Sequence, residues 1–346
     1  MTDEILTRVD GSVGYVTLNR PKALNSLNQT MVDALATVLT AWSADDAIET
    51  VVLDGAGERG LCAGGDVVAL RQSALGDGAD ARKFWSDEYR VNRLIGRFPK
   101  PYVALMDGIV MGGGVGLSAH GSVRVVTDTT KLAMPEVGIG FIPDVGGTYV
   151  LAQTPGGLGL YAALTGSTFT GADAIALGFA DHFVPHDKLA DFKADIAGNG
   201  IDTALRRHTV EPPPSNLAAQ RYWIDECFGT AESPRPLLDI VAGLSEHDAG
   251  PANDAATVIA GRSPISVAVT REAIRRAADH LSLEDALIQE YRVSCASLRS
   301  HDFVEGIRAQ LVDKDRNPKW SPSSLAAVTR EDIDAYFAPA DPDLTF

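Results

Sequence analysis

The chain has 346 residues, of which 45% are hydrophobic and 7% aromatic, together with 33 glycines. This length allows a sizeable core in one large domain or two ordinary ones, and the glycine content suits an α/β protein with many tight turns. The formal net charge of −16 argues against nucleic acid or an anionic membrane as the main partner, because both attract basic surfaces. Neither a signal peptide nor a membrane-spanning apolar run is evident, so a cytoplasmic location is expected.

The first half of the chain alternates short apolar runs with amphipathic segments. Strands are expected at 12–19, 50–55 and 101–108, and an amphipathic helix follows Asn28, a favourable N-cap residue. An exposed insertion at 73–81 precedes a further helix. The order of strand, loop and helix predicts stacked βα units with a mostly parallel sheet.

From about residue 170 onward the hydrophobic pattern becomes helical. Proline-rich breaks at 210–216 and 232–236 interrupt this pattern and are expected to end helices. We therefore predict an α/β core over 1–190 and a mainly helical region over 191–346 that closes the active site.

The cysteines and histidines give little support for metal or thiol chemistry. Three cysteines lie far apart, which indicates a reducing compartment: Cys62, Cys227 and Cys295. Although Cys62 stands beside a glycine-rich loop, a small buried thiol is favoured over a nucleophile. His182 and His186 are separated by a proline that opposes a shared helix face, so no metal site is expected.

Two glycine clusters follow expected strands, GLCAGGDV at 60–67 and MGGGVGLSAHG at 111–121. Backbone without side chains lets a ligand approach closely, and N–H groups at the start of a helix suit a developing oxyanion. Tight turns between strand and helix are the plainer explanation. Two other motifs in the second cluster, a dinucleotide G-x-G-x-x-A and a nucleophile elbow at Ser118, are incomplete.

The segment AMPEVGIGFIPDVGG at 133–147 holds two carboxylates, Glu136 and Asp144, in otherwise apolar company. A catalytic acid/base pair in a dry pocket would have this composition, because mutual repulsion and burial push one pKa upward. Alternatively, Glu136 caps a turn and Asp144 binds the backbone N–H groups of its own turn.

These motifs together resemble the crotonase (enoyl-CoA hydratase/isomerase) superfamily, and within it the 3-hydroxyisobutyryl-CoA hydrolases. The resembling segments keep the family's order over almost the whole chain: LNRPKALNSL at 18–27, GLCAGGDV, KPYVALMDGIVMGGGVGLS at 100–118, AMPEVGIGFIPDVGGTYVL at 133–151 and HDFVEGIRAQLVDKDRNPKW at 301–320. The resemblance implies an α/β fold, a crotonase-like spiral of ββα units with a helical C-terminal region.

The resemblance also implies a set of site residues. The oxyanion donors fall on the backbone N–H groups of Gly65 and Gly113, and the catalytic carboxylates on Glu136 and Asp144. Hydratases of the superfamily carry a glutamate where this chain has Gly116, so half of the hydratase acid/base pair is missing. The pattern therefore favours thioester hydrolysis, with Glu136 as nucleophile or general base and Asp144 handling the proton.

Further residues are matched to the substrate. Glu88 corresponds to a substrate-contacting glutamate of the hydrolases, although an exposed helix acid is the plainer alternative. Five residues are candidates for binding coenzyme A, including the lysines that would offset the acidic net charge near its phosphates: Lys22, Ala63, Asp66, Lys314 and Lys319. We expect no metal and no separate cofactor, since coenzyme A is part of the substrate. The resemblance implies a homo-oligomer built from trimers, and the alternative is that the longer C-terminal part covers that interface.

The leading interpretation is hydrolysis of a small branched β-hydroxyacyl-CoA thioester in valine breakdown. Another reaction of the same superfamily, such as hydration, isomerisation or dehalogenation, is the nearest alternative. A non-catalytic scaffold that binds coenzyme A or partner proteins, and a nicotinamide oxidoreductase, are alternatives of other classes.

Overall fold

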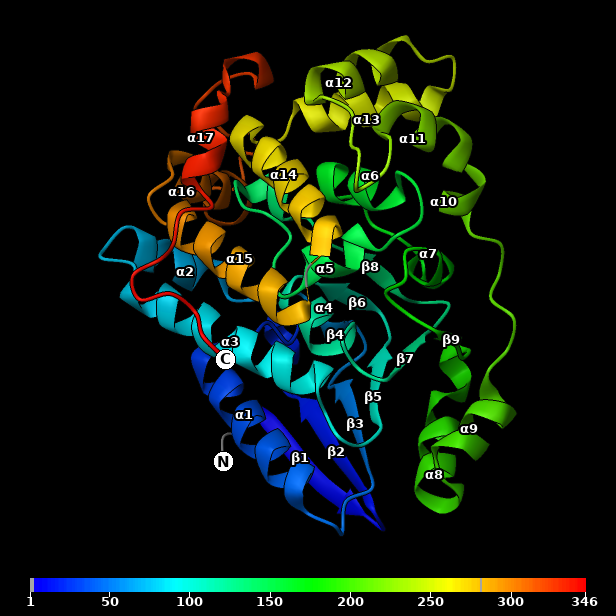
Figure 1. Ribbon diagram of the computed structural model, residues 1–346. Coiled ribbons are helices and arrows are strands. Elements are labelled where there is room, and N and C mark those ends of the chain that lie inside the picture. The colour runs from blue at the N-terminus through cyan, green and yellow to red at the C-terminus, as the bar shows by residue number, and fades with distance from the viewer. Residues whose placement is uncertain (1–2, 281) are drawn as a thin grey trace. The chain divides into compact units, whose positions relative to one another are not determined.

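The computed structural model describes residues 3–280 and 282–346, and Figure 1 labels its elements. The chain forms two compact units that interleave along the sequence. Unit 1 comprises Met1–Gly65, Asp87–Ala133 and Thr168–Asn216, and unit 2 comprises Asp66–Ser86, Met134–Ser167 and Leu217–Phe346. The division at residue 190 that the sequence suggests stays a prediction.

Both sheets lie in unit 1 among the described residues. The larger sheet has the order β1-β2-β3-β5-β7-β9, and its strands are β1 (Ile5–Asp10), β2 (Val13–Leu18), β3 (Thr50–Gly55), β5 (Tyr102–Met106), β7 (Val123–Val126) and β9 (His182–Phe183). The first pair is antiparallel and the other pairs are parallel. The smaller, parallel sheet contains β4 (Gly60–Cys62), β6 (Ile109–Met111) and β8 (Lys131–Ala133).

The two sheets show how the chain winds. Strands β3 and β4 are consecutive in the chain but belong to different sheets, as are β5 and β6, and β7 and β8. Each turn of the chain therefore adds one strand to each sheet. This is the spiral of ββα units that the sequence predicts, and the mostly parallel sheet is confirmed as well.

The expected strands form because their apolar runs are buried. The runs at 12–19, 50–55 and 101–108 become β2, β3 and β5, and every residue of β5 is buried, as is typical of a parallel sheet covered on both faces. Val52, Val103 and Val125 pack with Phe192 and other apolar side chains in one core cluster. The sequence patterns do not single out β1 or the short strands.

The helices, in chain order, have the following bounds. They are α1 (Gln29–Ala44), α2 (Val67–Ala74), α3 (Ala79–Gly96), α4 (Gly113–Ser118), α5 (Gly147–Ala152), α6 (Leu158–Thr165), α7 (Gly171–Ala176), α8 (Leu189–Asn199), α9 (Ile201–His208), α10 (Asn216–Ala219), α11 (Arg221–Phe228), α12 (Leu237–Glu246), α13 (Gly250–Ala260), α14 (Pro264–His280), α15 (Leu283–Ser297), α16 (His301–Ile307) and α17 (Arg330–Ala335). Short 3-10 segments are η1 (Pro21–Ala23), η2 (Glu136–Ile139), η3 (His186–Lys188) and η5 (Leu325–Ala327), and η4 (Arg308–Val312) is a π-helical turn.

Local signals position several of these helices. The Asn28 side chain accepts a hydrogen bond from the Met31 N–H at 2.9 Å, which confirms it as the N-cap of α1. The proline-rich breaks separate α9 from α10 and α11 from α12, as expected. Among the described residues, no helix is long and apolar enough to cross a membrane.

Candidate active site

The first glycine cluster follows β4 in unit 1. Backbone hydrogen bonds attach this loop to the segment after η1: the Ala63 N–H donates to the Leu24 carbonyl at 3.0 Å, and the Leu27 N–H donates to the Gly64 carbonyl at 2.8 Å. Leu27 also forms a parallel bridge with Gly65. The Gly65 backbone is therefore fixed by its neighbours, close in the fold to the turn that carries Lys22.

The second glycine cluster connects β6 to α4. Gly112 turns the chain with φ of 48° and ψ of −119°, a conformation that suits glycine, and Gly113 is the first residue of α4. The first N–H groups of a helix have no intrahelical acceptor and remain available to a ligand. A Cβ added at Gly64 would lie 3.7 Å from the Gly113 nitrogen, so the two loops lie side by side within unit 1.

Glu88, on the second half of α3, reaches these loops. Its exposed fraction is 2%, so the alternative of an exposed helix acid is wrong. A Cβ added at Gly113 would lie 2.6 Å from Glu88 Oε1. The charge of Glu88 also contributes to raising the pKa of Cys62, on the strand that leads into the first loop. Glu88 is thus in contact with one donor loop and electrostatically coupled to the other.

The two nucleophile candidates near the loops are inert. Burial raises the pKa of the Cys62 thiol to about 12, so it is protonated at neutral pH. The Ser118 hydroxyl is buried and donates to the Gly114 carbonyl within α4 at 2.7 Å. The structure therefore supports the plainer interpretation of both residues.

In unit 2, Glu136 begins the single 3-10 turn η2. Gly140 ends this turn with φ of 74°, and a Cβ at Gly140 would meet the Asp302 carbonyl of α16 at 2.0 Å. Phe141 stacks on Trp85 with ring centroids 5.4 Å apart, and Phe303 contacts both rings. Tight backbone packing and aromatic side chains thus hold the turn in an apolar environment.

The carboxyl group of Glu136 is almost completely withdrawn from water. Its exposed fraction is 6%, and no described residue forms a hydrogen bond with its Oε2 atom. Burial raises the pKa of Glu136 well above its ordinary value, and the nearby charge of Asp144 raises that pKa further. The protonated form of Glu136 is therefore favoured relative to that of an exposed glutamate, and its Oε2 atom can accept a hydrogen bond from a substrate.

Asp144 lies in the turn that leads into α5. Its exposed fraction is also 6%, and the turn places Val145 and Gly146 at positive φ angles of 55° and 80°. The Gly147 N–H donates to the Asp144 carbonyl at 2.7 Å, which closes the turn. Both sequence-predicted carboxylates therefore lie buried in unit 2, and the charge of Asp144 acts on Glu136.

A third buried carboxylate, Glu290 of α15, organises this turn. It is fully buried and accepts hydrogen bonds from the Gly146 N–H at 2.6 Å, the Thr148 N–H at 3.0 Å and the Thr148 hydroxyl. Burial raises the pKa of Glu290 to about 8, although these hydrogen bonds lower it. The backbone N–H groups of Gly146 and Thr148 are thus bound by a carboxylate that lies far from them in the sequence.

The sequence patterns do not single out Glu290. One signal could have done so: Glu290 falls on the face of α15 that also carries the buried Leu283, Ala286 and Leu287, so it interrupts the apolar stripe. An acid at such a position needs hydrogen-bond donors from another element, and the sequence does not say which.

The candidate residues for coenzyme A are more scattered. Lys22 is exposed in η1, next to the Ala63 loop of unit 1. In unit 2, the Asp66 side chain accepts from the Ala69 N–H at 3.3 Å and caps α2. Lys314 and Lys319 are exposed in the segment after η4, where Lys319 Nζ donates to Asn317 Oδ1 at 2.9 Å. Their roles stay predictions.

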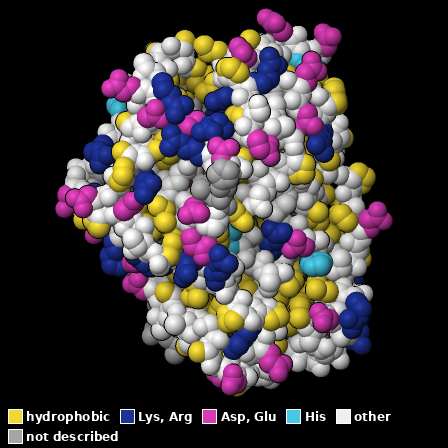
Figure 2. All heavy atoms as spheres, viewed as in Figure 1, with side chains coloured by type: hydrophobic (Ala, Val, Ile, Leu, Met, Phe, Trp, Pro, Cys, Tyr) yellow, Lys and Arg dark blue, Asp and Glu magenta, His cyan; other side chains and the backbone are white. Residues whose placement is uncertain are grey.

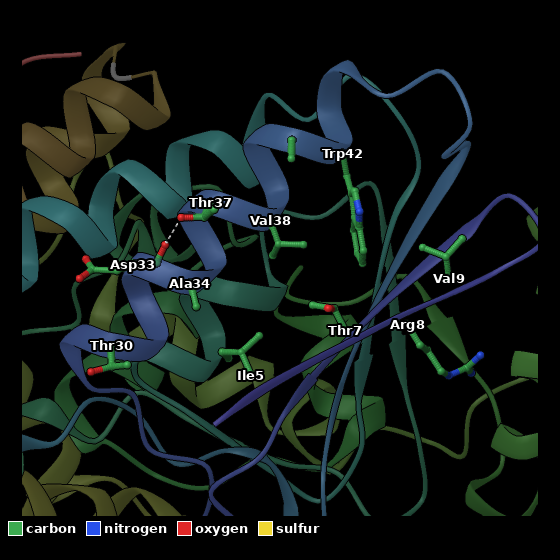
Figure 3. Close-up of a pocket in the computed structure, with 11 residues that line it drawn as sticks. Ile5, Thr7, Arg8, Val9, Thr30, Asp33, Ala34, Thr37, Val38 and Trp42 are labelled. Carbon is green, nitrogen blue, oxygen red and sulfur yellow. Dashed lines mark hydrogen bonds between the residues drawn. The ribbon is translucent and has the colours of Figure 1, made fainter. Parts of the chain in front are cut away.

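A groove of about 790 Å³ lies elsewhere in unit 1, between β1 and α1. Figure 3 shows Ile5 and Val9 of β1 on one side, and Val38 and Trp42 of α1 on the other. Its lining includes none of the sequence-predicted site residues, so it is not a candidate for the catalytic centre. In the part of the chain that the structure describes, no group of three or more histidine, cysteine or acidic residues could hold a metal ion.

Comparisons with known proteins agree with the fold and the motifs. The family model described as enoyl-CoA hydratase/isomerase matches residues 13–337. The chain is 39% identical to the mitochondrial 3-hydroxyisobutyryl-CoA hydrolase of Danio rerio, covering 98% of this chain and 90% of that protein. The human protein of the same name is 37% identical, with 97% and 88% covered.

Two solved structures are also similar over nearly the whole chain. One, described as a carnitinyl-CoA dehydratase from Mycobacterium thermoresistibile, is 63% identical with a TM-score of 0.96 and covers 100% of this chain and 99% of that one. The other, an enoyl-CoA hydratase from Rhodobacter sphaeroides, is 39% identical with a TM-score of 0.93, with 99% and 100% covered.

Replacing Asp144 by asparagine should shift the pH dependence of activity. Because the Asp144 charge raises the pKa of Glu136, its removal should lower that pKa and move the acidic limb of the kcat/KM profile to lower pH. The profile is measured by acyl-CoA thiol release, with the exposed Asp248→Asn as control. An unchanged limb in Asp144→Asn would show that the two groups are not coupled.

Replacing Glu290 by glutamine should loosen the turn that carries Asp144. Glutamine has one acceptor oxygen where the carboxylate uses two, so either the Gly146 N–H or the Thr148 N–H loses its acceptor. We therefore expect kcat to fall about tenfold, as for a misplaced general acid or base. Thr148→Val removes only the hydroxyl donor and should have a smaller effect. The exposed Glu246→Gln serves as control, and equal activity of all three variants would contradict the role of Glu290.

Proposed function

Because the chain belongs to the enoyl-CoA hydratase/isomerase family, we propose that it hydrolyses the thioester of a short branched β-hydroxyacyl-CoA, with 3-hydroxyisobutyryl-CoA as its substrate in valine breakdown. The products are 3-hydroxyisobutyrate and free coenzyme A. The observation that carries the proposal is the buried carboxyl pair of Glu136 and Asp144, with the pKa of Glu136 raised. The names of the vertebrate relatives support the choice of substrate.

In the proposed reaction, the two glycine loops supply the hydrogen-bond donors for the oxyanion. The thioester oxygen accepts hydrogen bonds from the backbone N–H groups of Gly65 and Gly113. Two such donors stabilise the negative charge that develops on this oxygen, each typically by about 3 kcal/mol. Their loops are fixed by the backbone contacts of Gly64 with Leu27 and with the start of α4, which keeps the donors in place before the substrate binds.

Glu136 and Asp144 supply the carboxyl groups of the reaction. The pair shares one proton, and in the reactive form Asp144 holds that proton while Glu136 is ionised. Glu136 then attacks the carbonyl carbon, the carbon–sulfur bond breaks, and a mixed anhydride with Glu136 forms as the coenzyme A thiolate leaves. Asp144 handles the proton that the thiolate gains and orients the water that then hydrolyses the anhydride. The water's hydroxyl adds to the acyl carbon or the glutamyl carbon, and its proton returns to a carboxylate of the pair.

A hydratase or dehydratase is the second candidate, because a structure described as a carnitinyl-CoA dehydratase is 63% identical to this chain. Hydration of an enoyl-CoA by the usual pair of glutamates needs an acid where this chain has Gly116, which is buried in α4 and has no side chain. The intact Asp144 and the missing glutamate together favour hydrolysis.

Basic residues near the substrate phosphates would have to offset the acidic net charge. We assign this role to Lys22, Lys314 and Lys319, with the backbone of Ala63 and Asp66 alongside coenzyme A. Figure 2 shows another group of basic side chains over α14 and α17, but Arg275, Arg276 and Arg330 all form ion pairs with Glu272. Their charges are engaged within the protein.

Three further expectations stay predictions. The enzyme needs no separate cofactor, since coenzyme A arrives as part of the substrate. It works in the cytoplasm, although the vertebrate relatives are named as mitochondrial. It forms a homo-oligomer built from trimers.

A panel of acyl-CoA thioesters tests the function. We expect 3-hydroxyisobutyryl-CoA to be hydrolysed at least about a hundredfold faster than isobutyryl-CoA in kcat/KM, because polar groups that bind a hydroxyl are left unpaired when it is absent. Thiol release is measured for both substrates and for 3-hydroxypropionyl-CoA, and hydration is measured with crotonyl-CoA. Equal rates with isobutyryl-CoA would indicate a general short-chain thioesterase, and rapid hydration without thiol release would indicate a hydratase.

The role of Glu136 is tested by Glu136→Gln, which we expect to bind acyl-CoA but to turn over at least about a thousandfold more slowly, as for a lost nucleophile. Hydroxylamine added during turnover of the wild type should trap Glu136 as a hydroxamate, detected by mass spectrometry of the peptide. Single turnover in ¹⁸O-water can also label Glu136. If neither label nor hydroxamate is found, Glu136 acts as a general base; the exposed Glu58→Gln is the control for the variant.

A further inference from the structure

Asn92 of α3 is a buried amide whose role the mechanism above leaves open. It is fully buried, and neither its Nδ2 nor its Oδ1 atom has a hydrogen-bond partner among the described residues. Folded proteins pair nearly all buried side-chain polar atoms, with protein groups or with ordered water. An amide with both ends open in a packed interior therefore indicates a bound water.

The position of Asn92 relates it to Glu88. The two residues are four apart on α3, so their side chains lie on the same face of the helix, with Cβ atoms about 5–6 Å apart. Glu88 in turn contacts Gly113 and influences Cys62. Asn92 therefore lies one helical turn after Glu88, whose carboxyl group reaches the donor loops.

Both residues are buried, with exposed fractions of 2% for Glu88 and 0% for Asn92. Glu88 contacts the Gly113 loop, so an effect of Asn92 on the site would act through Glu88.

We propose that Asn92 is a positioning residue for Glu88. Its amide binds one buried water, the water donates a hydrogen bond to the Glu88 carboxylate, and Glu88 is thereby held in the orientation that binds the β-hydroxyl of the substrate. Water of this kind links polar groups almost as effectively as a direct hydrogen bond. The assignment rests on the proposed function, because it takes the hydroxyl of a β-hydroxyacyl thioester as the group that Glu88 binds.

The test is Asn92→Leu, which keeps the branched shape of the side chain at a somewhat larger volume and removes both polar atoms. Because an apolar side chain of similar shape leaves no unpaired polar atom at position 92, we expect the chain to stay folded with little change in its thermal midpoint. The ratio of kcat/KM for 3-hydroxyisobutyryl-CoA to that for isobutyryl-CoA should fall at least about tenfold, with the isobutyryl-CoA value changed less than about threefold. Asn92→Ser, which leaves room and a hydroxyl for the water, should restore part of the ratio.

Thr270→Val is the matched control, because the Thr270 hydroxyl on α14 is another buried side-chain atom without a partner in the described chain. It should leave the ratio unchanged. If Asn92→Leu lowers both substrates equally, or leaves the ratio within about twofold, Asn92 has only a structural role and the proposal is overturned.

A second measurement does not depend on turnover. A crystal structure of the full chain that resolves ordered water should show one water within hydrogen-bond distance of both the Asn92 amide and the Glu88 carboxylate. An empty site there overturns the positioning role even if the hydrolase activity is found. Conversely, failure of the wild type to release thiol from any β-hydroxyacyl-CoA contradicts the proposed function, and the water remains the test of the Asn92–Glu88 link.

Discussion

Two carboxyl groups within one short segment, Glu136 and Asp144, are held almost out of contact with water. Ionising both at once in such an environment is costly because each charge loses its hydration and repels the other. Ionising both groups is therefore less favourable than for two exposed acids, which is the condition that acid and base catalysis by neighbouring carboxyl groups requires. Several contacts within unit 2 keep the two carboxyl groups in this buried environment.

Maintaining it requires support from segments distant in the sequence. The close approach of the Gly140 turn to the Asp302 carbonyl leaves no space for a side chain, and the rings of Trp85, Phe141 and Phe303 pack against one another in the same region. Glu290 ties down the backbone that follows Asp144. Helices α15 and α16 thus contribute no sequence-predicted catalytic group. They nevertheless hold in place the turn that carries Glu136 and the turn that carries Asp144.

The sequence predicts those features that depend on local patterns. Neighbouring residues are enough to predict three of them: the N-cap at Asn28, the buried strands β2, β3 and β5, and the apolar sequence around Glu136 and Asp144. Glu290 and Asn92 could not be assigned in this way, because their meaning lies in partners, or a lack of partners, that only the folded chain reveals. The three-residue strands β4, β6 and β8 are too short to show a period.

The burial of Cys62 has a consequence for an enzyme whose product is a thiol. Thiol–disulfide exchange proceeds through the thiolate, and with a pKa of about 12 the Cys62 thiol is almost entirely protonated in a cell. Oxidised coenzyme A, the disulfide of the proposed thiol product, is thus denied a mixed disulfide with the strand that leads into the first donor loop. Cys227 and Cys295 are buried as well. Burial of the cysteines thus protects the protein from forming a mixed disulfide with the oxidised form of its proposed product.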